Sequence, residues 1–258
     1  MKKFTVVLMA VLMVLLCLAA HGEESDLAYV QGKGKLIVGI TDFAPMDYKN
    51  EAGEWIGFDA DLAKAFAAKL GVEVEFVEID WDNKILELNG KSIDCVWNGM
   101  TLTSEVLSAM ECSKAYANNA QVVVVPSAKA AEFDSVESMA ALSFAVEAGS
   151  AGAAEVTALG YAMTEVSSQA AALMEVSAGT SDAAVIDALM AAAMVGEGTG
   201  YETLTYTYAL NSEEYGVGFR KGSDLAEALN NYMAEAYADG SMMTIAETYG
   251  VQAAIIAQ

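Results

Sequence analysis

Three short apolar runs separated by helix-forming segments constrain the fold of this chain more than any other feature. Residues 35–40, 72–79 and 93–97 are rich in aliphatic residues and end at turns, which is typical of strands. Apolar residues recur at helical spacing between them, from residue 59 to 70 and from 84 to 88. This strand–helix–strand–helix–strand order predicts a parallel sheet with right-handed crossovers.

The pattern starts again after Pro126. Further strands are expected at residues 142–147, 162–166 and 183–186, each followed by a helix. The remaining chain predicts an extended run at 203–208, a strand at 215–219, and helices at 224–237 and 242–249. The sequence therefore predicts an α/β protein in which one strand-and-helix unit is doubled.

The first 22 residues predict a secretory signal peptide. Lys2 and Lys3 precede an apolar run, and small residues stand at 20–22, where a signal peptidase cleaves. The run is short for a membrane span of about 20 residues, so a membrane anchor is not favoured. A lipid anchor at Cys17 is not favoured either, because Leu16 stands where lipidation needs a small residue. We expect an exported protein at the periplasmic or extracellular face of the membrane.

The composition excludes several function classes. The formal net charge is −23, which repels phosphate backbones and argues against a nucleic acid partner. The only histidine is His21, beside the predicted signal, so no imidazole remains for a catalytic triad or the usual zinc sites. We expect no catalytic residue, no metal and no cofactor. Cys95 and Cys112 are expected to be free thiols, with a disulfide as the alternative.

Polar and aromatic residues follow the first three predicted strands. Asp42 and Phe43 follow the first strand, Trp81 the second, and residues 98–101 the third. Ligands of open α/β sheets bind at the carboxyl ends of strands, where these residues would meet. The sequence therefore predicts a binding site at this edge of the sheet.

Several motifs, in order and spacing, are similar to those of one known family. They are Gly57-Phe58-Asp59-Ala60-Asp61-Leu62, Gly99-Met100-Thr101-Leu102-Thr103, Ser113-Lys114-Ala115-Tyr116, Ser181 to Asp187, and Tyr215 to Gly222. Together they resemble the extracellular solute-binding proteins of polar amino acid ABC importers, which have the two-lobed type II periplasmic-binding fold. The resemblance implies a first lobe of residues 33–120 and 210–258, a second lobe of residues 121–209, and hinge strands near 121–125 and 205–209.

The resemblance also implies which residues meet the ligand. From the first lobe these are Asp42, Phe43, Trp81, Asn98, Gly99 and Thr101. Phe43 and Trp81 would stack on the ligand side chain, while Gly99 and Thr101 would offer N–H and O–H groups to a carboxylate. From the second lobe, Gly149 and Ser150 at a helix N-terminus would help bind the carboxylate, and Asp187 would bind an α-ammonium group.

One position departs from the family pattern. Relatives carry an arginine that binds the ligand α-carboxylate three residues after the second threonine of the turn, and this chain has Val106 there. Ala151 also stands where many relatives have a hydroxyl. Three explanations remain open: Lys114 or Lys84 replaces the arginine, uncharged donors suffice, or the ligand has no α-carboxylate.

The sequence thus predicts a binding protein that captures a zwitterionic or cationic amino acid, or a related amine, by lobe closure. We expect a monomer that delivers this ligand to an ABC permease. Two alternatives use the same fold: a ligand receptor for a sensor or chemotaxis system, and an exported enzyme of the dehydratase type. The absence of Lys and Arg between Lys129 and Arg220 argues against acidic solutes.

Overall fold

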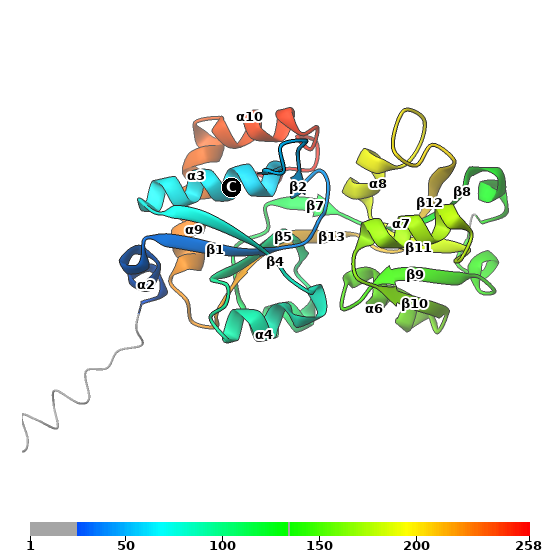
Figure 1. Cartoon of the computed structure of the whole chain (residues 1–258), viewed down its shortest axis with the longest axis horizontal. Coiled ribbons are helices and arrows are strands. Elements are labelled where there is room, and N and C mark those ends of the chain that lie inside the picture. The colour runs from blue at the N-terminus through cyan, green and yellow to red at the C-terminus, as the bar shows by residue number, and fades with distance from the viewer. Residues whose placement is uncertain (1–24, 134) are drawn as a thin grey trace, which may run out of the picture.

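The computed structural model describes residues 25–133 and 135–258, so the predicted signal peptide and Cys17 lie outside the described residues. Two sheets lie next to each other along the long axis of the molecule, each with helices packed on it (Figure 1). The structure is therefore a two-lobed α/β protein, as the sequence predicts.

The first lobe is built on a six-stranded sheet with the order β4–β1–β5–β13–β6, in which β7 also pairs with β13. Strands β1, β4 and β5 are parallel, whereas β13 runs antiparallel to β5. The strands are β1 (Lys35–Ile40), β4 (Glu73–Glu78), β5 (Cys95–Thr101), β6 (Glu111–Cys112), β7 (Ala117–Asn119) and β13 (Glu213–Phe219). A separate hairpin joins β2 (Tyr48–Lys49) to β3 (Trp55–Ile56).

The helices of the first lobe cover both faces of this sheet (Figure 1). They are α2 (Asp26–Lys33), α3 (Phe58–Leu70), α4 (Lys84–Asn89), α5 (Ser104–Ala109), α9 (Leu225–Ala238) and α10 (Ser241–Thr248), with a 3₁₀ turn, η1, at Trp81–Asn83. Helix α3 ends at Gly71, whose φ of 75° is the left-handed conformation that glycine adopts without strain. Phe66 of α3 packs on Trp97 of β5, with ring centroids 6.2 Å apart, and fixes the helix on the sheet.

The second lobe is built on a five-stranded sheet with the order β10–β9–β11–β8–β12. Its strands are β8 (Gln121–Pro126), β9 (Ser143–Glu147), β10 (Ala162–Val166), β11 (Ala183–Asp187) and β12 (Leu204–Ala209). Its helices are α6 (Ala151–Leu159), α7 (Gln169–Ala178) and α8 (Ala188–Met194), with 3₁₀ turns at Ser127–Glu132 (η2) and Glu137–Met139 (η3). The Ser150 hydroxyl accepts a hydrogen bond from the Ala153 N–H and thereby caps α6.

The chain passes between the two sheets twice. It crosses at Ala120, between β7 and β8, and again at residues 210–212, between β12 and β13. The strands that the sequence predicts as hinge strands are β8 and β12, which pair with each other inside the second sheet. Since β11 pairs antiparallel with β8, Asp187 lies opposite Gln121, directly beside the first crossing.

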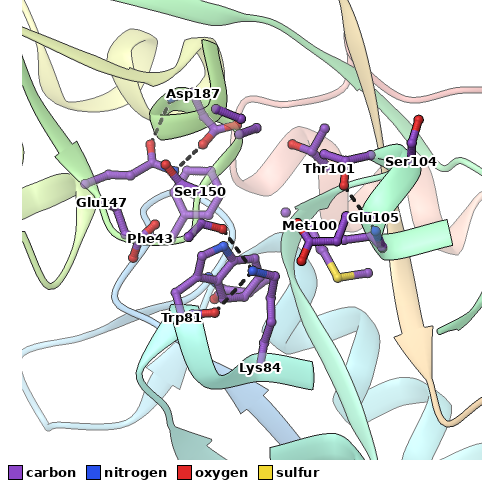
Figure 2. Close-up of a pocket in the computed structure, with 18 residues that line it drawn as sticks. Phe43, Trp81, Lys84, Met100, Thr101, Ser104, Glu105, Glu147, Ser150 and Asp187 are labelled. Carbon is purple, nitrogen blue, oxygen red and sulfur yellow. Dashed lines mark hydrogen bonds between the residues drawn. The ribbon is translucent and has the colours of Figure 1, made fainter. Parts of the chain in front are cut away.

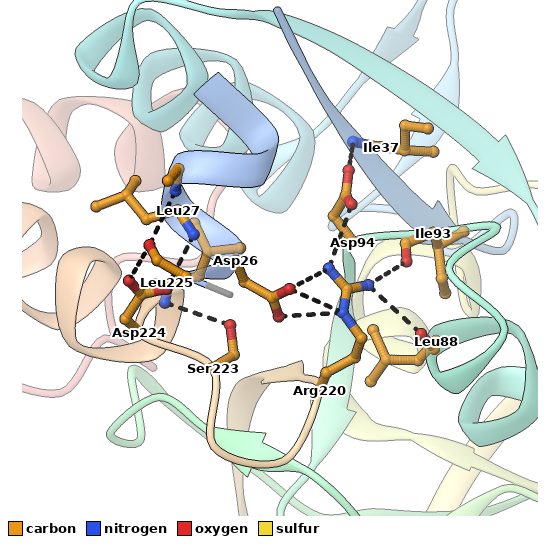
Figure 3. A network of polar contacts seen from close by, with 12 residues as sticks. Asp26, Leu27, Ile37, Leu88, Ile93, Asp94, Arg220, Ser223, Asp224 and Leu225 are labelled. Carbon is orange, nitrogen blue, oxygen red and sulfur yellow. Dashed lines mark hydrogen bonds and ion pairs between the residues drawn. The ribbon is translucent and has the colours of Figure 1, made fainter. Parts of the chain in front are cut away.

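The only arginine lies beside α2, the helix at the end of the first lobe that is far from the second sheet (Figure 1 and Figure 3). Arg220 is buried and donates to both carboxylate oxygens of Asp26, and its Nη1 donates to the Ile93 carbonyl oxygen at 2.9 Å. Its Nη2 also lies 3.5 Å from Asp94. This arrangement joins α2, β5 and β13, so Arg220 stabilises the first lobe.

Cys95 is buried and Cys112 is half-buried, and both are free thiols. Within the described part of the chain, no helix is both long enough and apolar enough to span a membrane.

Candidate ligand-binding cleft

A cavity of about 260 Å³ lies between the two lobes, where the carboxyl ends of strands from both sheets meet. Eight of the nine predicted site residues line it. They are Phe43, Trp81, Asn98, Gly99 and Thr101 from the first lobe, and Gly149, Ser150 and Asp187 from the second. The structure thus brings together residues that lie up to 144 positions apart in the chain.

Asp42 is the predicted residue that does not line the cavity. Its neighbours Thr41 and Phe43 are buried, but Asp42 is exposed. Successive residues of an extended chain point to opposite sides, so the orientation that directs Phe43 into the cleft directs Asp42 away from it.

Aromatic rings form much of the first wall. The Phe43 ring packs directly on the backbone of Gly99, where an added Cβ would lie 2.3 Å from the ring. Gly99 also has a φ of 56°, so both space and conformation require glycine here. Trp81 is 7% exposed, and the Lys84 ammonium lies 4.9 Å from its ring centroid.

The polar groups of the first wall already have partners within the first lobe. The Gly99 N–H donates to Asp59 at 2.6 Å, and the Thr101 hydroxyl donates to Glu213 at 2.9 Å. The Asn98 amide donates to the Thr41 hydroxyl and accepts from the Thr41 N–H. These groups therefore hold the turn in place, and the Gly99 N–H does not point to a free position for a ligand carboxylate.

Asp59 lies under the turn as a buried acid. Burial raises the pKa of its carboxyl to about 7, and hydrogen bonds from the Tyr116 hydroxyl and the Gly99 N–H oppose this rise. Its motif was part of the family resemblance, and in the structure it anchors Gly99.

The second wall presents Asp187 at the end of β11. Its two oxygens accept hydrogen bonds from Asn119, Gln121, Gln169 and Tyr215, with the Tyr215 hydroxyl at 2.7 Å. Burial, followed by the nearby Glu213 charge, raises the pKa of Asp187 to about 7, while the Tyr215 and Gln169 donors lower it. The carboxylate is therefore held rigidly beside the crossing between the lobes.

Glu147 also lines the cavity, and sequence reasoning missed it. It ends β9, is 3% exposed, and its Oε1 atom has no hydrogen-bond partner among the described residues. Burial and the neighbouring Asp187 raise its pKa to about 8, against the opposing effect of Lys84. The sequence signal that could have identified Glu147 is its position at the end of a predicted strand. The same criterion identified Asp187 as a candidate site residue.

Direct contacts join the two lobes across the cleft (Figure 2). The Lys84 ammonium donates to the Gly149 carbonyl oxygen at 2.9 Å and to the Trp81 carbonyl oxygen at 3.2 Å. Gly149, with a φ of 68°, lies so close to Asp82 that an added Cβ would be 2.8 Å from the Asp82 Cα. The lobes are therefore closed in this structure.

Lys84 is the only lysine or arginine among the described residues that line the cavity. Burial lowers the pKa of its ammonium, although Glu105, Glu147 and Asp82 act in the opposite direction. Lys114 does not line the cavity, whereas Val106 lines it from α5. Within residues 25–133 and 135–258, no group of three or more His, Cys, Asp or Glu residues could hold a metal ion.

Two sheets joined by two crossings, with a polar and aromatic cavity between them, define a two-lobed solute-binding protein. The sequence profile of the bacterial extracellular solute-binding proteins, family 3, matches residues 36–252. The chain belongs to this family, which confirms the family and the fold that the motifs predicted. It is accordingly an extracellular solute-binding protein of the class that serves ABC importers.

Among its relatives is the arginine-binding extracellular protein ArtP of Bacillus subtilis. It is 29% identical over 249 residues, which cover 94% of this chain and 95% of ArtP. The histidine-binding periplasmic protein of Escherichia coli is 28% identical over 220 residues, which cover 80% of this chain and 84% of that protein.

Two solved structures are similar over most of the chain. A mutant of ArgBP from T. maritima has a TM-score of 0.82 and 32% identity, and the match covers 87% of this chain and 98% of that one. The ancestral amino acid-binding protein AncCDT-1, described as a precursor of cyclohexadienyl dehydratase, has a TM-score of 0.80 and 30% identity. That match covers 87% of this chain and 99% of the other.

Proposed function

We propose that this protein captures a cationic amino acid or a related amine in the cleft between its lobes and delivers it to the permease of an ABC importer. One observation carries the ligand class: the cavity is lined by three carboxylates and one lysine. The carboxylates belong to Glu105, Glu147 and Asp187, and the lysine is Lys84. Such a cavity attracts cations and repels acidic solutes. ArtP and ArgBP, relatives named for arginine binding, support this ligand class.

The nine predicted site residues enter this proposal with different roles. Phe43 and Trp81 supply ring faces for the stem and the cationic group of the ligand. Asp187 binds the α-ammonium group, and the N–H groups at the start of α6, next to Gly149 and Ser150, bind a carboxylate where the ligand has one. Asn98, Gly99 and Thr101 shape the first wall, and Asp42 attracts cations from outside the cavity.

In this proposal, the protein captures its ligand by closing its two lobes over it. Residues 33–120 with 210–258 and residues 121–209 act as two bodies that close over the ligand, and Lys84 with Gly149 forms a contact of the closed state. We propose that the protein works as a monomer and that residues 1–22 direct its export.

We propose binding rather than catalysis as its role. AncCDT-1 is itself named as an amino acid-binding protein, although it is also named as the precursor of a dehydratase. A receptor that reports the ligand to a sensor would use the same cleft, and neighbouring permease and ATPase genes would favour transport.

A thermal-shift screen tests the ligand class, because a ligand that binds the native state raises its melting temperature. The panel contains arginine, lysine, histidine, glutamine, glutamate, aspartate, putrescine and glucose. We expect the largest shifts with the cationic amino acids or the amine. Selective stabilisation by aspartate or glutamate would overturn the charge argument, and stabilisation by glucose alone would overturn the role in amino acid capture.

A further inference from the structure

We propose that Glu147 is a second cation-binding residue of the cleft, which takes the second cationic group of a dibasic ligand while Asp187 takes the first. This inference rests on the proposed function and narrows its ligand class. The ligand would carry two positive charges on one short chain, as dibasic amino acids and diamines do.

The first observation is the difference between the two buried acids of the cavity. Asp187 accepts hydrogen bonds from four side chains of its own protein. Glu147 is as deeply buried, at 3% exposure, yet its Oε1 atom has no partner among the described residues. A buried polar atom without a partner is costly, and a ligand N–H group would remove that cost.

The second observation concerns the charges that face Glu147. Asp187 of β11 and Asp80, just before η1, add negative charge, and Lys84 of α4 is the facing cation. The Lys84 ammonium, however, donates to the carbonyl oxygens of Trp81 and Gly149. The Glu147 Oε1 atom is therefore left without a cation from the protein, and a ligand cation could occupy this position.

The third observation is the wall opposite these acids. Phe43 and Trp81 line the same cavity and offer the apolar and π surfaces that the stem and cationic end of a dibasic ligand require. Among the described residues, the second lobe places no Lys or Arg on this cavity that could neutralise its two acids. The cavity is thus better matched to a ligand with two positive charges than to a neutral zwitterion.

The test compares arginine with citrulline, which has nearly the same shape but a neutral urea group in place of the guanidinium. Affinities for the mature chain and for Glu147→Gln would be measured by isothermal titration calorimetry. We expect the unmodified protein to bind arginine at least about 10-fold more tightly than citrulline, the ratio that roughly one additional charged hydrogen bond provides. Glu147→Gln should lower this ratio to near 1 and change the citrulline affinity by less than about threefold.

Glu165→Gln is the matched control, because Glu165 lies at an exposed position on β10 of the same lobe and does not line the cavity. It should keep the preference for arginine. An arginine preference that survives Glu147→Gln would overturn the inference, as would equal binding of arginine and citrulline by the unmodified protein. The latter comparison needs no variant and therefore does not depend on the folding of Glu147→Gln.

The same titrations separate this inference from the proposed function. Binding of both compounds without discrimination would leave amino acid capture intact and reject the role of Glu147. Failure to bind either compound, together with binding of glutamate, would reject both.

Discussion

The two walls of the cleft use their polar groups in different ways. In the first lobe, the polar groups of the turn form hydrogen bonds with residues of the same lobe, as Gly99, Asn98 and Thr101 show. The surface that this wall presents to the cavity therefore consists mainly of aromatic ring faces. In the second lobe, two buried carboxylates face the cavity, and one of them has an oxygen without a partner. The first wall thus provides mainly shape, with Lys84 and Glu105 as its charged residues, and the second wall provides the two buried carboxylates. Ligand selection by charge should therefore respond mainly to changes in the second lobe.

The largest expected effect comes from removing the charge of Asp187. Asp187→Asn keeps the size of the side chain but loses the charged hydrogen bond to the ligand ammonium, so we expect affinity to fall by about 100-fold in calorimetry. Glu197→Gln, at an exposed position of the second lobe, is the control and should change nothing. An unchanged affinity in Asp187→Asn would reject the role of Asp187.

The closed contact between the walls can be broken at Gly149. Gly149→Ala places a Cβ 2.8 Å from the Asp82 Cα, so closure is impeded and affinity should fall by roughly 10-fold or more. Gly160→Ala is a close control, since Gly160 has a φ of 70° but no atom within 4 Å of an added Cβ. It should cost about 1 kcal/mol of stability and leave affinity unaltered. Equal affinity losses in both variants would mean that backbone strain, and not closure, is responsible.

The contribution of the aromatic wall should be smaller. Phe43→Leu keeps an apolar side chain but loses the ring face, so we expect cationic ligands to bind about 5-fold more weakly, within the range of a partly exposed cation–π contact. Neutral ligands of similar size should lose less. If arginine and citrulline weaken equally, the ring acts by packing alone.

The smallest effect concerns pH and stability without ligand. Glu147 has a pKa raised to about 8, and Asp187 and Asp59 have pKa values raised to about 7, so between about pH 4.5 and pH 8 the folded chain binds more protons than the unfolded chain. Stability therefore falls as pH rises through this window, and the melting temperature should drop by a few degrees. Glu147→Gln should flatten this drop. Ligand binding should strengthen over the same window, because a cation prefers the ionised carboxylates. A melting temperature that rises from pH 5 to pH 8 in the unliganded protein would contradict this account.

The fold was largely predictable because strand and helix periodicity is a local property of the chain. The helix expected at residues 59–70 is α3, and the strand expected at residues 35–40 is β1. The candidate cavity residues were partly predictable, since strand ends at one sheet edge meet regardless of side-chain detail. Glu147 was missed although it ends a predicted strand, because the sequence does not show which of the many acids becomes buried. Its unpartnered oxygen exists only once both lobes surround it.

The hydrogen-bond roles of the turn were less predictable. The Gly99 N–H and the Thr101 hydroxyl were expected to face a carboxylate, but Asp59 and Glu213, 40 and 112 residues away, accept their hydrogen bonds. Such long-range partners depend on the packing of the sheet, which periodicity does not specify. Asp42 was predicted to meet the ligand, but it is exposed and does not line the cavity. The side to which this residue points depends on the tertiary structure.

The network around Arg220 has a mechanical consequence. Ser25 and Asp26, the first described residues, bond to Asp224 and Arg220, so the chain enters the molecule through the outer end of the first lobe (Figure 3). Among the described residues, the chain enters and leaves the second lobe only at Ala120 and at residues 210–212. A pull on the N-terminal side of the chain therefore acts on the first lobe and does not load the two crossings on which lobe movement depends.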